Sequence, residues 1–273
     1  MTATEVVPAA HRLVLSADEY QYLIELARVD MPPGWEPKVA EHSASVRSEL
    51  AKRGVLQRHD GRFTVHPSVL INLRTLTTPM IIVDTTVSIG NRESRSLHTL
   101  AGQLGASLFA LEDGAVELSM FAAVNLGQEL IRAVPAEPDS GISSVLGGSA
   151  DREPLPSGRV PLGALHELGL AALLAGADPD APRAVLEGLD LPADQAYLAR
   201  HVSRSDGVLR SLVTARTPSG VTSSVVLWLH LESRWLGILP DPDGSGRHLV
   251  RLEPVSRTDL GTWVAPFIAG VLS

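Results

Sequence analysis

The chain has 273 residues, of which 44% are hydrophobic and 20% charged, so it can bury a sizeable core and is not a disordered segment. It contains no cysteine, which excludes a disulfide, a thiolate nucleophile and cysteine-ligated zinc and is compatible with a reducing cytoplasm. Its formal net charge is -8 and its arginines are scattered among acids, so its field disfavours nucleic acid and anionic membranes as partners.

The first ten residues do not resemble a signal peptide, because Glu5 stands where a basic region is required and no apolar run follows. A helix that spans a membrane needs roughly 20 apolar residues. The longest apolar run, at residues 168–175, is much shorter and is typical of a buried helix. We therefore expect a cytoplasmic protein that does not span a membrane.

The N-terminal part of the chain carries signals for short strands and helices in alternation. Ser16 and Glu19 have the spacing of a capping box at the start of a helix, and Gly54 is a typical helix stop. Asp60 and Gly61 predict a tight hairpin turn. We predict strands at 12–15, 55–56 and 63–65, and helices from Ser16 to before Met31, over 39–53 and over 67–76.

A first group of longer strands is expected next, because β-branched residues dominate and turn residues separate the runs. Gly90-Asn91 predicts one turn, and Asp113-Gly114 predicts a second hairpin. We predict strands at 80–89, 97–101, 107–111 and 116–120, followed by a helix over 122–133.

The composition changes at Pro135, where Pro, Gly, Ser and Asp replace the apolar periodicity. We divide the chain into an N-terminal half (1–134), a flexible linker (135–160) and a C-terminal half (161–273) of one globular domain. For the last part we predict helices at 161–175, 181–189, 192–202 and 256–271, and strands at 208–215, 221–231, 235–239 and 248–252.

The two halves repeat the same order of elements at a spacing of about 125 to 135 residues, which is far longer than a solenoid period. Asp-Gly turns stand at 113–114 and again at 243–244. We interpret the match as a duplication. Duplicated halves can pair their edge strands into one continuous antiparallel sheet, which also removes exposed edges. The alternative is a chance likeness between two stretches of helices and hairpins.

The sequence contains no motif that predicts catalysis, a cofactor or a metal. His166-Glu167 begins like a zinc-protease helix, but Leu170 occupies the position of the second histidine. The glycine-rich stretches at 147–149 and 244–246 match neither a phosphate loop nor a nucleophile elbow. A hydrolase whose triad residues meet only in space remains an alternative, which requires a deep pocket with a His beside a Ser and an acid.

A DNA-binding regulator is the second alternative, because the run from Val55 to Leu73, preceded by two helices, resembles a winged-helix layout of two helices and a two-stranded wing. Basic residues do gather there, but acidic residues dilute the cluster. The basic residues are Lys38, Arg47, Lys52, Arg53, Arg58 and Arg62, and the acidic ones are Glu36, Glu41, Glu49 and Asp60.

A series of loose patterns runs along nearly the whole chain. These patterns are Leu13-Val14-Leu15-Ser16-x-x-Glu19, Leu50-x-x-x-Gly54-Val55-Leu56, Asp60-Gly61-x-Phe63-x-Val65-x-Pro67, the sheet that starts at Pro79, Trp235-x-Gly237 and Gly246-Arg247. Their order resembles the EspG family of ESX (type VII) secretion-associated proteins. The resemblance implies an α+β fold of two quasi-symmetric halves that share a central antiparallel sheet with flanking helices.

The resemblance also implies a non-enzymatic cytosolic chaperone. Its partner would be a protein substrate of PE/PPE type, bound near the tip of a helical bundle and kept soluble for export. The family's binding surface involves the sheet, so we expect contacts in the strands at 80–89 and 221–231, with the linker behind them. The candidate residues there are Val83, Thr85, Val87, Ser224, Val226 and Trp228.

Overall fold

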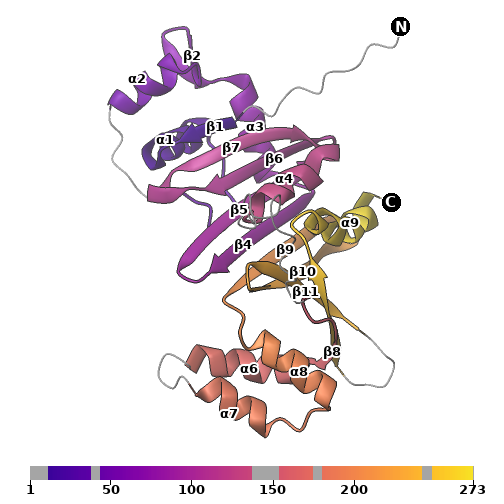
Figure 1. Ribbon diagram of the computed structural model, residues 1–273. Helices are drawn as coiled ribbons and strands as arrows, with labels where there is room; N and C mark the ends of the chain where they lie inside the picture. Colours follow the sequence, from indigo (N-terminus) through magenta and orange to yellow (C-terminus); the bar gives the residue numbers. More distant parts are fainter. Residues whose placement is uncertain (1–11, 38–43, 137–153, 175–179, 242–247, 273) are drawn as a thin grey trace, which may run out of the picture.

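One ten-stranded antiparallel sheet organises the computed structural model, which describes residues 12–37, 44–136, 154–174, 180–241 and 248–272 (Figure 1). The N-terminal half supplies β1 (Arg12–Leu15), β4 (Ile81–Ile89), β5 (Arg92–Ala101), β6 (Leu104–Ala110) and β7 (Val116–Ala122). The C-terminal half supplies β8 (Gly158–Pro161), β9 (Gly207–Thr217), β10 (Gly220–Leu231), β11 (Arg234–Pro240) and β12 (Leu249–Val255).

The strand order is a mirror image about the centre of the sheet: β1-β7-β6-β5-β4 on one side and β9-β10-β11-β12-β8 on the other. The two halves join where β4 pairs with β9, and Thr85 lies opposite Ser211 at the middle of that register. Their hydroxyl oxygens are 2.7 Å apart and buried, so a hydrogen bond joins the two halves at the middle of the sheet. The shared sheet and the two quasi-symmetric halves are as the sequence predicts.

Helices α1 (Ala17–Ala27), α2 (Ala44–Lys52) and α3 (Pro67–Thr77) cover one face of the N-terminal half, together with the hairpin β2 (Leu56–His59) and β3 (Arg62–Val65). The capping box forms as expected, since the Glu19 amide donates to the Ser16 hydroxyl and the Ser16 amide to the Glu19 carboxylate. Leu23 of α1 and Leu73 of α3 pack on Leu108 of the sheet in one buried cluster.

Helices α6 (Leu162–Leu174), α7 (Ala181–Gly188) and α8 (Ala193–Val202) take the equivalent place in the C-terminal half. Leu198 and Val202 of α8 pack with Leu236 and Leu252 of the sheet. The strand register places these residues on the same face of the sheet as the α1–α3 cluster. The two sets of helices lie at opposite ends of the molecule, with β4 and β9 between them (Figure 1).

The opposite face of the sheet is covered at its centre by α4 (Leu126–Ala133) and α9 (Asp259–Leu272). Leu130 and Val264 from these helices pack with Val83, Val213 and other residues of β4, β9 and β10. A Cβ atom on Gly261 would stand 3.1 Å from the Cα of Gly127, so two glycines allow the helices to approach closely. Short 3-10 turns, η1 (Glu112–Gly114) and η2 (Ala123–Asn125), flank β7.

Both edges of the sheet are strands of only four residues, which limits pairing with another chain. The β1 edge is also blocked, because Arg53 donates to the Val14 carbonyl oxygen and forms an ion pair with Glu19 at 2.9 Å. In the described part of the chain, no helix is long and apolar enough to cross a membrane.

The predicted strands and helices are confirmed in order and type wherever they fall on described residues, with one correction. Residues 158–161 form β8, although their composition placed residues up to 160 in the linker, because an edge strand with Gly and Pro lacks the usual strand composition. The hairpin predicted at Asp113-Gly114 is confirmed, since β6 pairs with β7 antiparallel and the 3-10 turn at 112–114 connects them. The start of the 39–53 helix, most of the linker and the 243–244 turn lie outside the described residues.

Candidate functional site

The two central strands, β4 and β9, each have one face under α4 and α9 and one face on the opposite side of the sheet, because side chains alternate along a strand. In β4, Val83 and Val87 are buried under α4 and α9, whereas Asp84 and Thr86 are half-buried on the opposite face. In β9 the alternation is the same, with Val213 covered and its neighbours Leu212 and Thr214 on the other side.

We call the uncovered side chains at the centre of the sheet the open face. They are Thr86, Arg210, Leu212, Thr214, Arg216, Val221, Ser223, Val225 and Leu227, and the register places them on one side of β4, β9 and β10. Leu212 lies directly opposite Val225, whose side chain is 49% exposed, and Val221 beyond it is 67% exposed. Leu212 and Leu227 are half-buried and Val225 is exposed, and none of the three belongs to a described core cluster, so the apolar strip is only partly covered in the described part of the chain.

The open face is a gap in the helical layer on its side of the sheet. Residues 17–77 supply helices over β5 to β7, and residues 162–202 supply helices over β8, β11, β12 and the C-terminal end of β10. The stretch between them spans β4, β9 and the N-terminal part of β10, which are three neighbouring strands. Three strands are about 10 Å wide from the first to the last, which is close to the diameter of one α-helix, about 10 Å.

A fixed arginine forms the N-terminal wall of this gap. Arg95 donates to Asp84 at 2.6 Å and to the Gly34 carbonyl at 2.7 Å, and its guanidinium lies 4.7 Å from the Trp35 ring centre. The hydrogen bond with Asp84 raises the pKa of Arg95 above its usual value, so the group stays charged. The segment after α1 is thereby tied to the sheet beside the open face.

The candidate residues named from the sequence lie in these central strands but on the covered face. Five of them are buried beneath α4 and α9 or at the strand junction, namely Val83, Thr85, Val87, Val226 and Trp228. Ser224 is half-buried on the same side. The correction follows from the alternation of side chains along a strand, because the neighbouring residue always points to the opposite face of the sheet. Thr85 instead joins the halves through Ser211.

The residues that sequence reasoning missed share one signal. Arg210 and Arg216 stand in β9 at the same alternation as Leu212 and Thr214, and both arginines are exposed. Charged residues rarely point into a core unless they are paired. The side of β9 on which these two arginines stand could therefore have been identified from the sequence as the solvent-facing side of the sheet.

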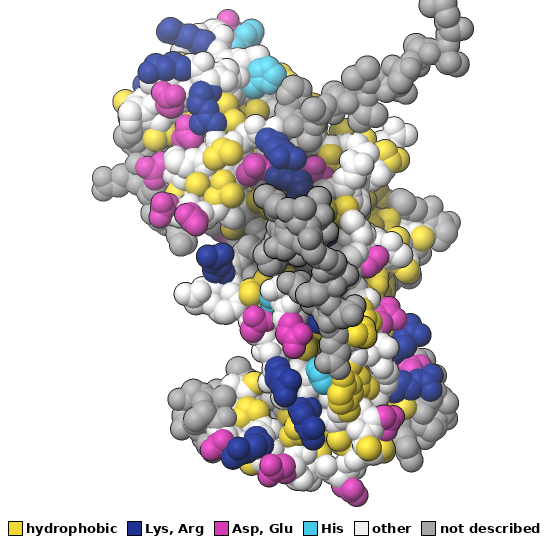
Figure 2. Space-filling model, viewed as in Figure 1, with side chains coloured by type: hydrophobic (Ala, Val, Ile, Leu, Met, Phe, Trp, Pro, Cys, Tyr) yellow, Lys and Arg dark blue, Asp and Glu magenta, His cyan; other side chains and the backbone are white. Residues whose placement is uncertain are grey.

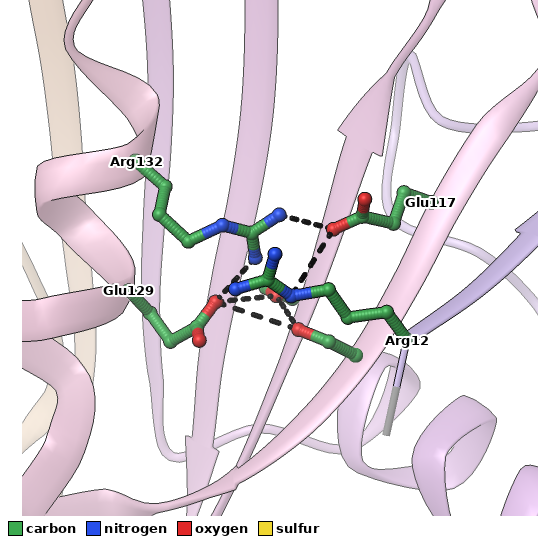
Figure 3. Close-up of polar contacts among 6 residues, drawn as sticks. Arg12, Glu117, Glu129 and Arg132 are labelled. Atoms are coloured by element: carbon green, nitrogen blue, oxygen red, sulfur yellow. Dashed lines mark hydrogen bonds and ion pairs between the residues drawn. The ribbon is translucent and has the colours of Figure 1, made fainter. Parts of the chain in front are cut away.

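A buried polar network lies beneath α4 on the covered face (Figure 3). Arg132 donates to Glu129 at 2.8 Å and also to Glu117, so its guanidinium lies between two carboxylates. The hydroxyls of Ser107 and Ser119 are 2.5 Å apart, and each lies 3.4 Å from the Glu129 carboxylate. The network holds α4 on β6 and β7.

His98 borders this network and brings a His, a Ser and an acid into one region, as the hydrolase alternative requires. The His98 ring is buried and packs edge-on against Phe109 at 5.3 Å. Burial, with a smaller effect of Arg132, lowers the pKa of His98 to about 4, so the ring is neutral. The neighbouring Ser107 and Ser119 are also fully buried, so a substrate has no access to either hydroxyl.

A second histidine with an acidic partner is His230, which lines a cavity of about 900 Å³ near the end of α4. His230 Nδ1 lies 2.6 Å from Asp206 Oδ1, and the His230 ring packs on Trp235 at 4.9 Å. Ser94 and Ser233 also line the cavity, yet no hydrogen bond within the described residues joins either serine to His230. The described residues contain no group of three metal-binding side chains.

The basic residues of the winged-helix alternative are largely engaged within the protein. Arg53 is paired with Glu19, Lys52 with Glu49 at 3.5 Å, and Arg47 packs over the Phe63 ring at 5.5 Å. Acidic and basic side chains are interspersed over the face shown in Figure 2. Such mixing gives no continuous basic stripe on that face of the kind that DNA binding needs.

The comparisons with known proteins concern the fold. No protein-family model and no curated protein sequence matches the chain. Among solved structures, the chain is similar to the type VII secretion system chaperone EspG5 of Mycobacterium tuberculosis, solved in complex with the PE25–PPE41 dimer. The TM-score is 0.64 at 13% identity, over 96% of both chains. HtdX of the same organism gives a TM-score of only 0.17 over 89% of this chain and 98% of its own, at 10% identity, and carries no argument. The chain therefore has an EspG-like fold.

Proposed function

We propose that this protein is a cytoplasmic, non-enzymatic chaperone of a type VII (ESX) secretion system. It binds a PE/PPE-like or other helical-hairpin substrate and keeps that substrate soluble until export. The observation that carries the proposal is the EspG-like fold along almost the whole chain, since the protein with that fold is a chaperone solved with its substrate dimer.

The open face supports a binding role. Exposed apolar side chains in the middle of a sheet are typical of a surface that another protein covers. Val225 and Val221 are exposed there, and Leu212 belongs to no described core cluster. A substrate with an apolar helical tip would otherwise aggregate, and covering both surfaces removes apolar area from water at about 25 cal/mol per Å².

The proposal is tested by co-expressing the protein with the small helical secretion substrates that are encoded beside its gene. We expect a stable equimolar complex and a substrate that is soluble only when co-expressed. Val225→Glu should abolish the complex, because it places a charge in the apolar strip. Val124→Glu is the matched control, since Val124 is 90% exposed in η2, outside the open face. The proposal fails if no substrate binds the folded protein. Equal binding by both variants would refute the open face as the binding surface and leave the chaperone role standing.

A further inference from the structure

The charges on the open face have a sign opposite to that of the protein as a whole. The chain carries a net charge of -8, yet Arg210 and Arg216 stand exposed on β9. Neither arginine forms an ion pair with a side chain in the described ranges. The nearest acid of β4 on this face, Asp84, is already engaged by Arg95. The apolar strip is therefore flanked by two available cations.

The position of the two arginines is set by the strand register. Arg210 lies opposite Leu227, and Arg216 lies opposite Val221, so each cation sits beside an apolar side chain of β10. Leu212 and Val225 form the pair between them. Arg210 and Arg216 are six positions apart along β9, so their Cα atoms are separated by about 20 Å. The surface thus has an apolar centre with a positive charge at each end.

We propose that the open face binds an amphipathic α-helix of its client whose apolar stripe is flanked by acidic residues. The shape favours a helix, because the gap in the helical layer is about one helix wide and a docked helix completes the two-layer packing. The charges favour acids, because a partner with basic flanks would meet Arg210 and Arg216 and lose affinity. In a helix aligned with β9, carboxylates that reach both arginines lie about 13 residues apart.

This inference rests on the proposal that the chain binds a protein client, and it adds the chemistry of the client segment. The probes are labelled synthetic helices of about 20 residues. They share one leucine stripe and differ only in flanks of Glu or of Lys. Binding to the full-length protein is measured by fluorescence anisotropy at low and at moderate salt. A single-stranded DNA oligonucleotide of the same length tests whether charge alone is sufficient.

We expect the Glu-flanked helix to bind at least about tenfold more tightly than the Lys-flanked helix, with a preference that shrinks as salt rises. The double variant Arg210→Glu/Arg216→Glu should reverse the preference. Arg62→Glu is the matched control, because Arg62 is exposed on β3, away from the open face, and should leave both affinities unchanged. Thermal unfolding of each variant shows whether the fold is intact.

The inference is overturned if the intact protein binds both helices equally or neither of them, if the double variant keeps the original preference, or if DNA competes as well as the Glu-flanked helix. These outcomes are separable from failure of the proposed function. A co-expressed substrate whose complex survives the double variant would refute the acidic flank and leave the chaperone role standing. Specific binding of the Glu-flanked helix without any binding of neighbouring substrates would support the inference and refute the proposed client.

Discussion

The buried His98 should make the stability of this protein depend on pH between neutral and mildly acidic conditions. Its pKa is about 4 in the folded protein, against an ordinary value of 6.5, because the ring is buried and faces Arg132. The unfolded chain therefore binds a proton more readily than the folded one. The contribution of His98 to the free energy of unfolding is therefore fully present above the ordinary pKa of histidine. It is lost as the pH falls toward the pKa that His98 has in the folded protein.

The magnitude follows from the two pKa values. The full difference corresponds to about 3 kcal/mol, and about 2 kcal/mol should be lost between about pH 7.5 and about pH 5.0. The assay is urea denaturation across that range for the natural protein and for His98→Phe, which removes the titrating group and keeps an aromatic ring. The difference in unfolding free energy between the two proteins should change by that amount. A difference that stays constant with pH would refute the buried neutral histidine.

Three further predictions concern packing. Gly105→Ala should lower the free energy of unfolding by about 2 kcal/mol in a thermal melt, because the new methyl group would overlap the Phe121 ring. In the same melt, Gly169→Ala in α6 should be neutral or stabilising, because the new methyl group meets no other atom. Trp228→Ala should cost about 3 to 5 kcal/mol in chemical denaturation, since the side chain is fully buried among Trp235 and Trp263, and a cost near zero would contradict that burial. Arg53→Ala should cost about 1 to 2 kcal/mol and increase aggregation by light scattering, because it uncovers the β1 edge, while Lys52→Ala at the preceding position should change neither.

Much of the fold could be predicted from local signals. Ser16 and Glu19 identified the start of the first helix, and Asp60-Gly61 identified the small hairpin. The repeated order of elements predicted the sheet that the two halves share. The strand β8 was missed because four residues with Gly and Pro at its ends carry no strand periodicity. It completes the mirror symmetry, since it takes on the C-terminal side the place that β1 takes on the N-terminal side.

The candidate residues were placed in the central strands, but on the side that helices cover. The sequence of β4 carried the relevant signal, because Val83 and Val87 share one side whereas Asp84, Thr86 and Ser88 share the other, which is the open side. The identity of the covering helices could not be predicted, because they lie far away in the sequence, around residues 130 and 264. Likewise, the meeting of His98 with Ser107 and Glu129 depends on strand register and on α4, which no local pattern encodes.

The central claim is that a client covers the open face, and site-specific labelling tests it most directly. The chain has no cysteine, so single-cysteine variants can be labelled with a maleimide without background. Ser223→Cys and Thr222→Cys form a matched pair, because these exposed neighbours in β10 lie on opposite faces of the sheet. In the purified complex with a co-expressed substrate, we predict that labelling slows strongly at position 223 and stays unchanged at position 222. Equal labelling of both positions, with and without the substrate, would contradict the claim.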